Sequence, residues 1–332
     1  MYRSLRCFLI PLLLLGWLAA GNPTSAQTSC FLWPSQISPI SLQSAVNQNT
    51  CVEIQAGVWT IPGPITMPSG HTLRGVNRDT AVLKADASVW PYSPTGSVVQ
   101  SVSSVNVVLS TFTIDANQES ALGAAARGMT IQNMRIKNAL CSGVTVAGAG
   151  MVIQNNIIEN NGSSCPVAPP GAGIYAEGVA AAYAPQITGN TIQNNGGPAL
   201  DVNGVWSGTF SGNTVANNAH WAAVSLYGAS GWTVEQNAIS HPATSQVQPY
   251  HSTCVGGPGG NHSAGIFLCQ DTDTNTQVTV NNTIRNNQVS SWYGILSIGN
   301  DQAQPYWAPR NNTFDGNNVF GSNFGCADDF QP

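Results

Sequence analysis

The sequence predicts an all-β solenoid, a single domain in which short strands repeat in stacked coils around one core. The first observation is a segment that recurs six times, with an apolar residue, polar residues that include an Asn, and a second apolar residue. Each copy is too short to bury its own apolar side, so the copies must stack. The copies are Ile153–Ile158, Ile187–Ile192, Phe210–Val215, Val234–Ile239, Ile284–Val289 and Phe314–Val319, and Ile131–Ile136 is a seventh with Met134 in place of the Asn.

The second observation is another strand, which recurs between these segments and begins with a small residue. Period-two alternation directs the residue after each small one into the core. The small residues, from Gly143 to Gly294, are separated by 30, 26, 24, 42 and 29 residues. The shortest spacing fits one coil of three strands, so the longer coils carry insertions. The core residues predicted in this strand are Val144, Ile174, Leu200, Val224, Ile266 and Ile295.

The recurring Asn residues share one register position, which is a third observation. We expect them to form an inward ladder at a turn, in which each side-chain amide bonds the backbone of the next coil. Such a ladder accounts for the Asn-rich composition without any catalytic chemistry. Its members are Asn156, Asn190, Asn213, Asn237, Asn287 and Asn317.

These repeats, together with Val52–Ile61 and Val105–Asp115, resemble the right-handed parallel β-helix proteins of the pectin-lyase-like superfold. The resemblance covers residues 38–322 and implies a single-domain right-handed parallel β-helix. It implies no particular activity, because that fold hosts lyases, hydrolases, epimerases, phage tail spikes and adhesins.

We expect four parts along the chain: a signal peptide at 1–26, an N-terminal cap with the first coil at 27–60, the β-helix at 61–322, and a C-terminal tail at 323–332. Ser41–Val46 has helical spacing, and a short helix there would cover the end of the core.

The first 26 residues are typical of a cleaved signal peptide. Arg3 and Arg6 precede the apolar stretch Phe8–Ala20, and the small residues Thr24–Ala26 follow it. The apolar stretch is short for a membrane span. We therefore expect a secreted protein, extracellular or periplasmic, that has no membrane attachment after cleavage.

Seven cysteines remain after such a cleavage, and an oxidising compartment favours three disulfides among them. Sequence spacing does not fix the connectivity. The arrangement we predict pairs Cys30 with Cys51, Cys141 with Cys165, and Cys254 with Cys269, and leaves Cys326 free.

Charged residues are scarce, and the formal net charge is −5. Beyond the signal peptide the chain has two Lys and six Arg, with no basic stripe, so nucleic acid is a poor partner. Long polyanions are disfavoured as well unless a metal ion bridges them.

The candidate site lies on the outward face of the second strand family, where alternation produces two stripes of side chains. Neighbouring coils lie about 4.8 Å apart and alternate residues on a strand about 6.6 Å apart. One patch on three adjacent coils therefore contains Tyr175, Glu177, Asp201, Asn203, Ser225 and Tyr227. The stripes are Thr145, Tyr175, Asp201, Ser225, Phe267 and Leu296, and Ala147, Glu177, Asn203, Tyr227, Cys269 and Ile298.

Two insertions enter at the same corner of the coil and would form the walls of a trough over this patch. They comprise residues 161–172 and 240–264 and stand three coils apart, or roughly 14 Å. His220, beside Trp221, and His262 lie at this corner and are candidate substrate-binding residues, although the His220–Trp221 pair is equally well explained as a cap on the coil.

A trough with carboxylates, aromatic rings and no cationic stripe suits a neutral polysaccharide. Glycoside hydrolysis needs one carboxyl as general acid and a second as base or nucleophile. Glu177 and Asp201 are diagonal neighbours about 8 Å apart, within the range of inverting enzymes. We predict them as the catalytic pair, with Tyr175, Asn203, Ser225 and Tyr227 binding substrate. Alternatively, both carboxylates are ordinary solvated groups on the protein surface.

Two other functions stay open. A polysaccharide lyase would use Tyr175, Tyr227 or a loop histidine as its base and would need a bound Ca²⁺ to neutralise a uronate. A non-catalytic β-helix that binds glycans or serves at a surface would show stacked aromatic rings without a close carboxylate pair. A hydrolase should instead have one carboxyl whose pKa is raised.

No cofactor other than calcium is indicated. Asp271, Asp273 and Asn275 are weak metal candidates that resemble the opening of a calcium loop. An EF-hand is excluded because Thr276 and Asn282 occupy its Gly and Glu positions.

Arg135–Lys137 is similar to a tripeptide of the pectin-hydrolysing branch of the fold, but it lies in the Asn-containing segment and upstream of the candidate carboxylates. The Asn-x-Asp and Gly-His-Gly signatures of that branch are missing as well. The sequence therefore places the chain outside that branch.

Overall fold

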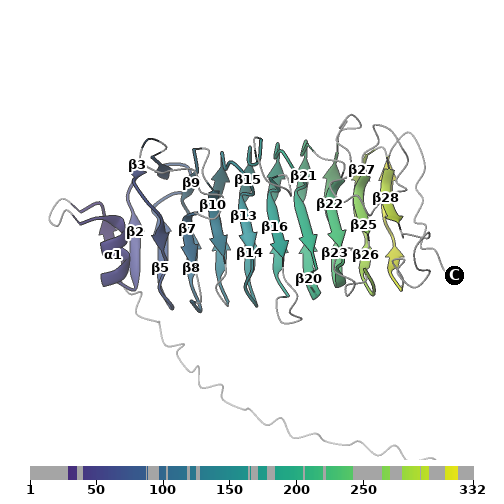
Figure 1. Ribbon diagram of the computed structural model, residues 1–332, viewed down its shortest axis with the longest axis horizontal. Coiled ribbons are helices and arrows are strands. Elements are labelled where there is room, and N and C mark those ends of the chain that lie inside the picture. Colours follow the sequence, from purple (N-terminus) through teal and green to yellow (C-terminus); the bar gives the residue numbers. More distant parts are fainter. Residues whose placement is uncertain are drawn as a thin grey trace, which may run out of the picture.

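The computed structural model of the protein describes residues 29–35, 40–86, 88, 97–101, 104–117, 120–124, 128–163, 165, 171–177, 184–204, 206–219, 222–241, 264–269, 279–291, 293–298 and 311–320. In these residues the chain forms successive coils that stack along one axis (Figure 1). The strands of the coils pair from coil to coil and form three parallel sheets. The predicted signal peptide and C-terminal tail lie outside the described residues. In the part of the chain that is described, no helix is long and apolar enough to cross a membrane.

Sheet A has eleven strands within the described residues, and each strand pairs with the next one along the axis. In that order they are β1 (Phe31–Trp33), β2 (Cys51–Ile54), β5 (Thr72–Gly75), β8 (Val108–Ser110), β11 (Thr130–Gln132), β14 (Val152–Gln154), β17 (Gln186–Thr188), β20 (Trp206–Ser211), β23 (Ser230–Glu235), β26 (Thr283–Arg285) and β29 (Thr313–Asp315).

Sheet B follows sheet A in every coil and has ten described strands. They are β3 (Gly57–Ile61), β6 (Ala81–Ala85), β9 (Thr113–Asp115), β12 (Arg135–Lys137), β15 (Ile157–Glu159), β18 (Thr191–Gln193), β21 (Thr214–Ala216), β24 (Ala238–Ser240), β27 (Gln288–Ser290) and β30 (Asn318–Phe320).

Sheet C completes the coil, and nine of its strands are described. They are β4 (Ile65–Thr66), β7 (Ser97–Ser101), β10 (Ser120–Ala124), β13 (Val144–Val146), β16 (Ile174–Glu177), β19 (Leu200–Asn203), β22 (Ala222–Tyr227), β25 (Ala264–Cys269) and β28 (Tyr293–Ile298).

The turn between sheets A and B explains the recurring polar segment. The residue before each ladder Asn has a φ between 54° and 63°, in the left-handed region. Gly adopts this conformation freely and Asn better than most residues, which is why these positions are Gly or Asn except at Gln236. The left-handed residues are Asn155, Gly189, Gly212, Gln236, Asn286 and Gly316.

The predicted Asn ladder is confirmed, except that each side-chain amide bonds the backbone of the preceding coil, as Asn190 Nδ2 does with Ile153 O. Asn156 Nδ2 donates to Asn190 Oδ1 at 3.0 Å, and Asn190 Nδ2 donates to Asn213 Oδ1 at 3.0 Å. The ladder continues through Asn237, Asn287 and Asn317. It begins at Met134, whose backbone N–H donates to Asn156 Oδ1, so no side-chain amide is needed in that first position.

Two further ladders were not predicted. Asn161, Asn195 and Asn218 form one at the corner between sheets B and C, with Nδ2···Oδ1 distances of 2.9 and 2.8 Å. Asn282 and Asn312 form another before β26 and β29. The corner ladder fixes the position from which the chain enters sheet C.

The core lies inside the coils and is formed by the predicted apolar positions. Val144, Ile174 and Leu200 have no exposed surface, and the later coils repeat them with Val224, Ile266 and Ile295. At the N-terminal end α1 (Leu42–Gln48) contacts β1, β2 and β4 and buries Leu42, Ala45 and Val46. This is the predicted capping helix, which begins after the N-cap residue Ser41.

Candidate functional site

The outward stripes of sheet C have the register that the alternation predicts. Tyr175 on β16 pairs with Asp201 on β19, and Asp201 pairs with Ser225 on β22. The second stripe aligns Glu177, Asn203 and Tyr227. The six predicted site residues within sheet C therefore form one patch on three adjacent coils.

These side chains differ sharply in exposure, which the alternation alone did not predict. Glu177 is exposed, whereas Tyr175 and Asn203 are partly buried. Asp201 is 8% exposed, and Ser225 and Tyr227 are buried as well. Period-two alternation gives the direction in which a side chain points but not whether it is covered.

The pKa of the Asp201 carboxyl is strongly perturbed. Burial raises its pKa to about 7, although a hydrogen bond from the Ser225 hydroxyl acts in the opposite direction. Burial disfavours the charged form, and the hydroxyl donor stabilises it. Asp201 therefore retains its proton in a substantial fraction of molecules near neutral pH.

Tyr175 connects the exposed carboxylate to the rest of the patch. Its hydroxyl donates a hydrogen bond to Glu177 and accepts one from the Asn203 amide. Burial, and then the charge of Glu177, raise the pKa of the Tyr175 hydroxyl well above its usual range. The hydroxyl therefore stays protonated and orients the Glu177 carboxylate.

The patch thus combines a buried carboxyl that is partly protonated near neutral pH with an exposed acidic side chain. Because Tyr175 and not Glu177 lies opposite Asp201, the two carboxyl groups are diagonal neighbours on adjacent strands. The strand spacings put their Cβ atoms about 8 Å apart. One group can donate a proton while the other activates a water molecule between them.

The first predicted insertion lies between β15 and β16 and is fixed at its base. The Cys141–Cys165 disulfide ties it to the preceding coil. Gly162 and Gly171 meet so closely that a Cβ on Gly162 would lie 2.1 Å from the Gly171 carbonyl oxygen. The described ends of the insertion therefore touch, so it leaves and re-enters the coil at one point.

The second insertion lies between β24 and β25. His262, His220 and Trp221 fall outside the described residues, as do Asp271, Asp273 and Asn275. Among the residues that are described, no group of three His, Cys, Asp or Glu side chains is arranged to hold a metal ion.

The disulfide predictions are confirmed for two pairs, Cys30–Cys51 and Cys141–Cys165. Cys269 is disulfide-bonded as well. Its predicted partner, Cys254, lies outside the described residues, as does Cys326.

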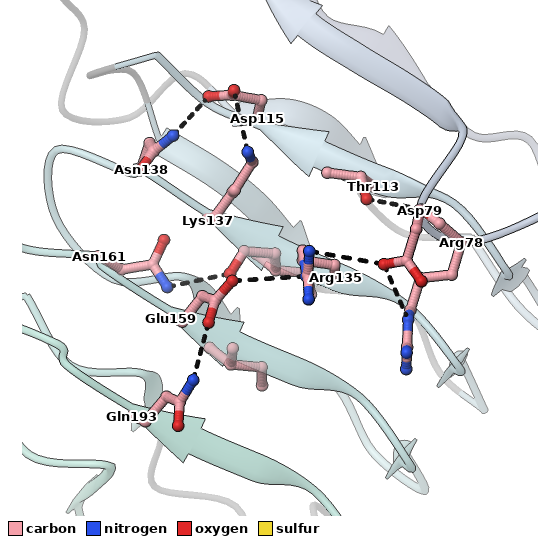
Figure 2. Close-up of polar contacts among 12 residues, drawn as sticks. Arg78, Asp79, Thr113, Asp115, Arg135, Lys137, Asn138, Glu159, Asn161 and Gln193 are labelled. Atoms are coloured by element: carbon pink, nitrogen blue, oxygen red, sulfur yellow. Dashed lines mark hydrogen bonds and ion pairs between the residues drawn. The ribbon is translucent and has the colours of Figure 1, made fainter. Parts of the chain in front are cut away.

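A second polar cluster covers the outer face of sheet B, and sequence reasoning missed it (Figure 2). Arg135 on β12 lies 3.5 Å from Asp79 and 3.4 Å from Glu159 on β15. Lys137 lies 3.6 Å from Asp115 on β9. The sequence does contain a signal for this cluster, since opposite charges occur at matching positions of successive repeats. Arg135 and Lys137, which resembled a catalytic tripeptide, thus belong to ion pairs between coils.

The C-terminal part of the chain, residues 165–329, matches a family model described as a right handed beta helix region. No match to the chain was found among curated proteins.

Several solved structures are similar to this chain at low sequence identity. An alginate lyase from Paenibacillus sp. strain FPU-7 has a TM-score of 0.58 at 13% identity, and the alignment covers 85% of this chain and 95% of the lyase. The catalytic domain of a GH87 α-1,3-glucanase in complex with nigerose has a TM-score of 0.51 at 14% identity, with 89% of this chain and 66% of that domain covered.

ORF18 of Geobacillus virus E2 has a TM-score of 0.52 at 13% identity, with 85% of this chain covered. The chain spans 58% of the length of that viral protein. At such identities the likeness establishes the fold. With the parallel coils and the matching family model, it shows that the chain is a right-handed parallel β-helix protein.

Proposed function

We propose that the protein is a secreted glycoside hydrolase that cleaves a neutral polysaccharide on the outer face of sheet C. Asp201 acts as the general acid and Glu177 as the general base. The observation that carries this proposal is the buried Asp201 carboxyl, whose pKa is raised to about 7, diagonally beside the exposed Glu177. A general acid must hold its proton near the working pH, and burial is how proteins achieve this for a carboxyl.

In the proposed reaction Glu177 accepts a proton from a water molecule that attacks the anomeric carbon. The bond to the leaving sugar breaks at the same time, and Asp201 donates its proton to the departing oxygen. Tyr175 holds the Glu177 carboxylate through its hydroxyl. The Cβ atoms of the two residues are about 8 Å apart, which leaves room for a water molecule between their carboxyl groups, so the proposed product has inverted configuration at the anomeric carbon.

The composition of the patch supports a neutral substrate. On the described strands β13 to β25, the outward stripes contain no Lys or Arg to pair with a uronate. Among similar structures, one is an alginate lyase and another an α-1,3-glucanase in complex with nigerose, which supports a polysaccharide as the substrate class. A lyase is less well supported, because a Tyr175 hydroxyl with a raised pKa is a poor acceptor of a sugar proton.

The test is product release from a panel of neutral and acidic polysaccharides, followed both as reducing ends and as unsaturated-uronate absorbance. The proposal predicts reducing ends without absorbance, and a loss of roughly 10²- to 10⁴-fold in rate for Asp201→Asn and for Glu177→Gln. Asp315→Asn and Glu235→Gln, on the outer face of sheet A, are the matched controls and should retain activity.

Other outcomes would contradict the proposal. Unsaturated products that persist in both variants would identify a lyase. Binding of a polysaccharide without any product would identify a non-catalytic glycan-binding protein.

A further inference from the structure

The outer face of sheet C changes from open to closed along the axis of the coils. In the first stripe Thr66 on β4 is exposed, and Gln100, Thr145 and Tyr175 are partly exposed. From Asp201 onward the stripe is closed: Asp201 is 8% exposed and Ser225 3%. Phe267 on β25, which pairs with Ser225, is 2% exposed.

The second stripe shows the same gradient independently. Ala147 and Glu177 are exposed and Asn203 is partly exposed. Tyr227 is 1% exposed and its neighbour Cys269 is 2% exposed. The first stripe therefore becomes buried between β16 and β19, and the second one coil later, between β19 and β22.

The closed end is a second apolar cluster, separate from the core inside the coils. It consists of Ala222, Tyr227, Ala264, Phe267 and Cys269 on β22 and β25. Tyr227 and Cys269 point outward from sheet C, since the residues directly before them, Leu226 and Leu268, point into the core. Because these side chains are already buried, they offer no free surface to a further sugar unit.

We infer that the site acts on the end of a polysaccharide chain, which approaches over β13 and β16 and stops against the buried cluster of β22 and β25. This inference rests on the proposed function. A chain bound along sheet C has room on the N-terminal side of Asp201, over Glu177, Ala147 and Thr145, and none beyond Ser225. The enzyme therefore removes short products from chain ends instead of cutting within the chain.

The first experiment compares viscosity with reducing ends, using the polysaccharide from which the unaltered protein releases products. The inference predicts that one short product accumulates while viscosity falls little. A rapid fall in viscosity with a broad ladder of product sizes would overturn the inference and leave the hydrolase assignment intact. Absence of product on every substrate would overturn the proposed function and this inference with it.

The second experiment tests the direction of approach. Thr145→Arg places a long side chain on the open side, one coil before Tyr175 and Glu177, and Thr313→Arg places the same side chain on the outer face of sheet A. We expect kcat/KM for a long oligosaccharide to fall about tenfold in Thr145→Arg, the loss of one favourable contact region, and to stay unchanged in the control. Equal kcat/KM values for the two variants would overturn the approach over β13.

Discussion

At the scale of single residues, the surroundings of a side chain decide its chemistry. Asp201 and Glu177 are both carboxylic acids on the same face of adjacent strands. Asp201 is buried and keeps its proton in a substantial fraction of molecules near neutral pH, whereas Glu177 is exposed and accepts a hydrogen bond from Tyr175. The sequence was sufficient to place both residues in one patch. It did not reveal which of them is buried, because alternation gives the direction of a side chain and not its coverage.

The raised pKa of Asp201 has a consequence for stability. The folded-state pKa of about 7 lies above the usual value of 3.8, so the folded protein binds one more proton than the unfolded chain between these pH values. The free energy of unfolding should therefore fall as pH rises from about 4 to about 7, by on the order of 4 kcal/mol. Chemical denaturation at a series of pH values measures this change.

Asp201→Asn is neutral at every pH and should remove this part of the pH dependence. Asp315→Asn, an exposed residue on β29, should keep it. A pH profile that Asp201→Asn leaves unchanged would show that another group titrates and would remove the reason for assigning Asp201 as the acid.

At the scale of elements, a local sequence pattern of four or five residues determines the turn between sheets A and B. A left-handed Asn or Gly precedes each ladder Asn except Asn237, which follows Gln236, and an apolar residue follows two positions later. This local pattern is why the fold was predictable. The corner ladder of Asn161, Asn195 and Asn218 was missed, although each of these residues also follows a left-handed Asn. Repeated Asn-Asn pairs after the sheet B strands were its sequence signal.

The residues at the centre of the ladder should contribute strongly to the free energy of unfolding. Asn213 donates to Ile187 O and to Asn237 Oδ1, and it accepts hydrogen bonds from Asn190. Asn213→Ala leaves several buried groups without partners and should lower the free energy of unfolding by roughly 3 kcal/mol or more. Chemical denaturation checks this.

Asn318→Ala is the control for this change, because Asn318 is exposed on β30 and its backbone N–H makes the bond to Asn287 O. Its stability should stay close to that of the unaltered protein. If the two substitutions had equal effects, the ladder would contribute nothing beyond the composition of the turn.

At the scale of the whole molecule, the β-helix is an array in which each coil contacts its neighbours. That is why repeat spacing sufficed to predict the architecture, whereas the capping helix was predicted from the helical spacing of Ser41–Val46. The closed end of the site could not be foreseen in the same way. Burial of Tyr227 and Phe267 is a property of the assembled face and leaves no mark on the period of the sequence.

The capping helix α1 has a consequence of another kind. An array of parallel strands has no intrinsic length, and any uncovered terminal strand is a template for pairing with another molecule. At the N-terminal end those strands are β1, β3 and β4, and α1 contacts two of them through the side that buries Leu42, Ala45 and Val46. The helix thus blocks the pairing of these terminal strands with another molecule, which would otherwise extend the array into a fibre.

Val46→Asp should detach the helix from the terminal strands, because it places a charge in the buried side of the helix. Gln48→Asp adds the same charge at an exposed position. We expect concentration-dependent growth of particles by light scattering for Val46→Asp and monodisperse protein for Gln48→Asp. A Val46→Asp protein that stays folded and monodisperse would show that the solenoid limits its own growth by other means.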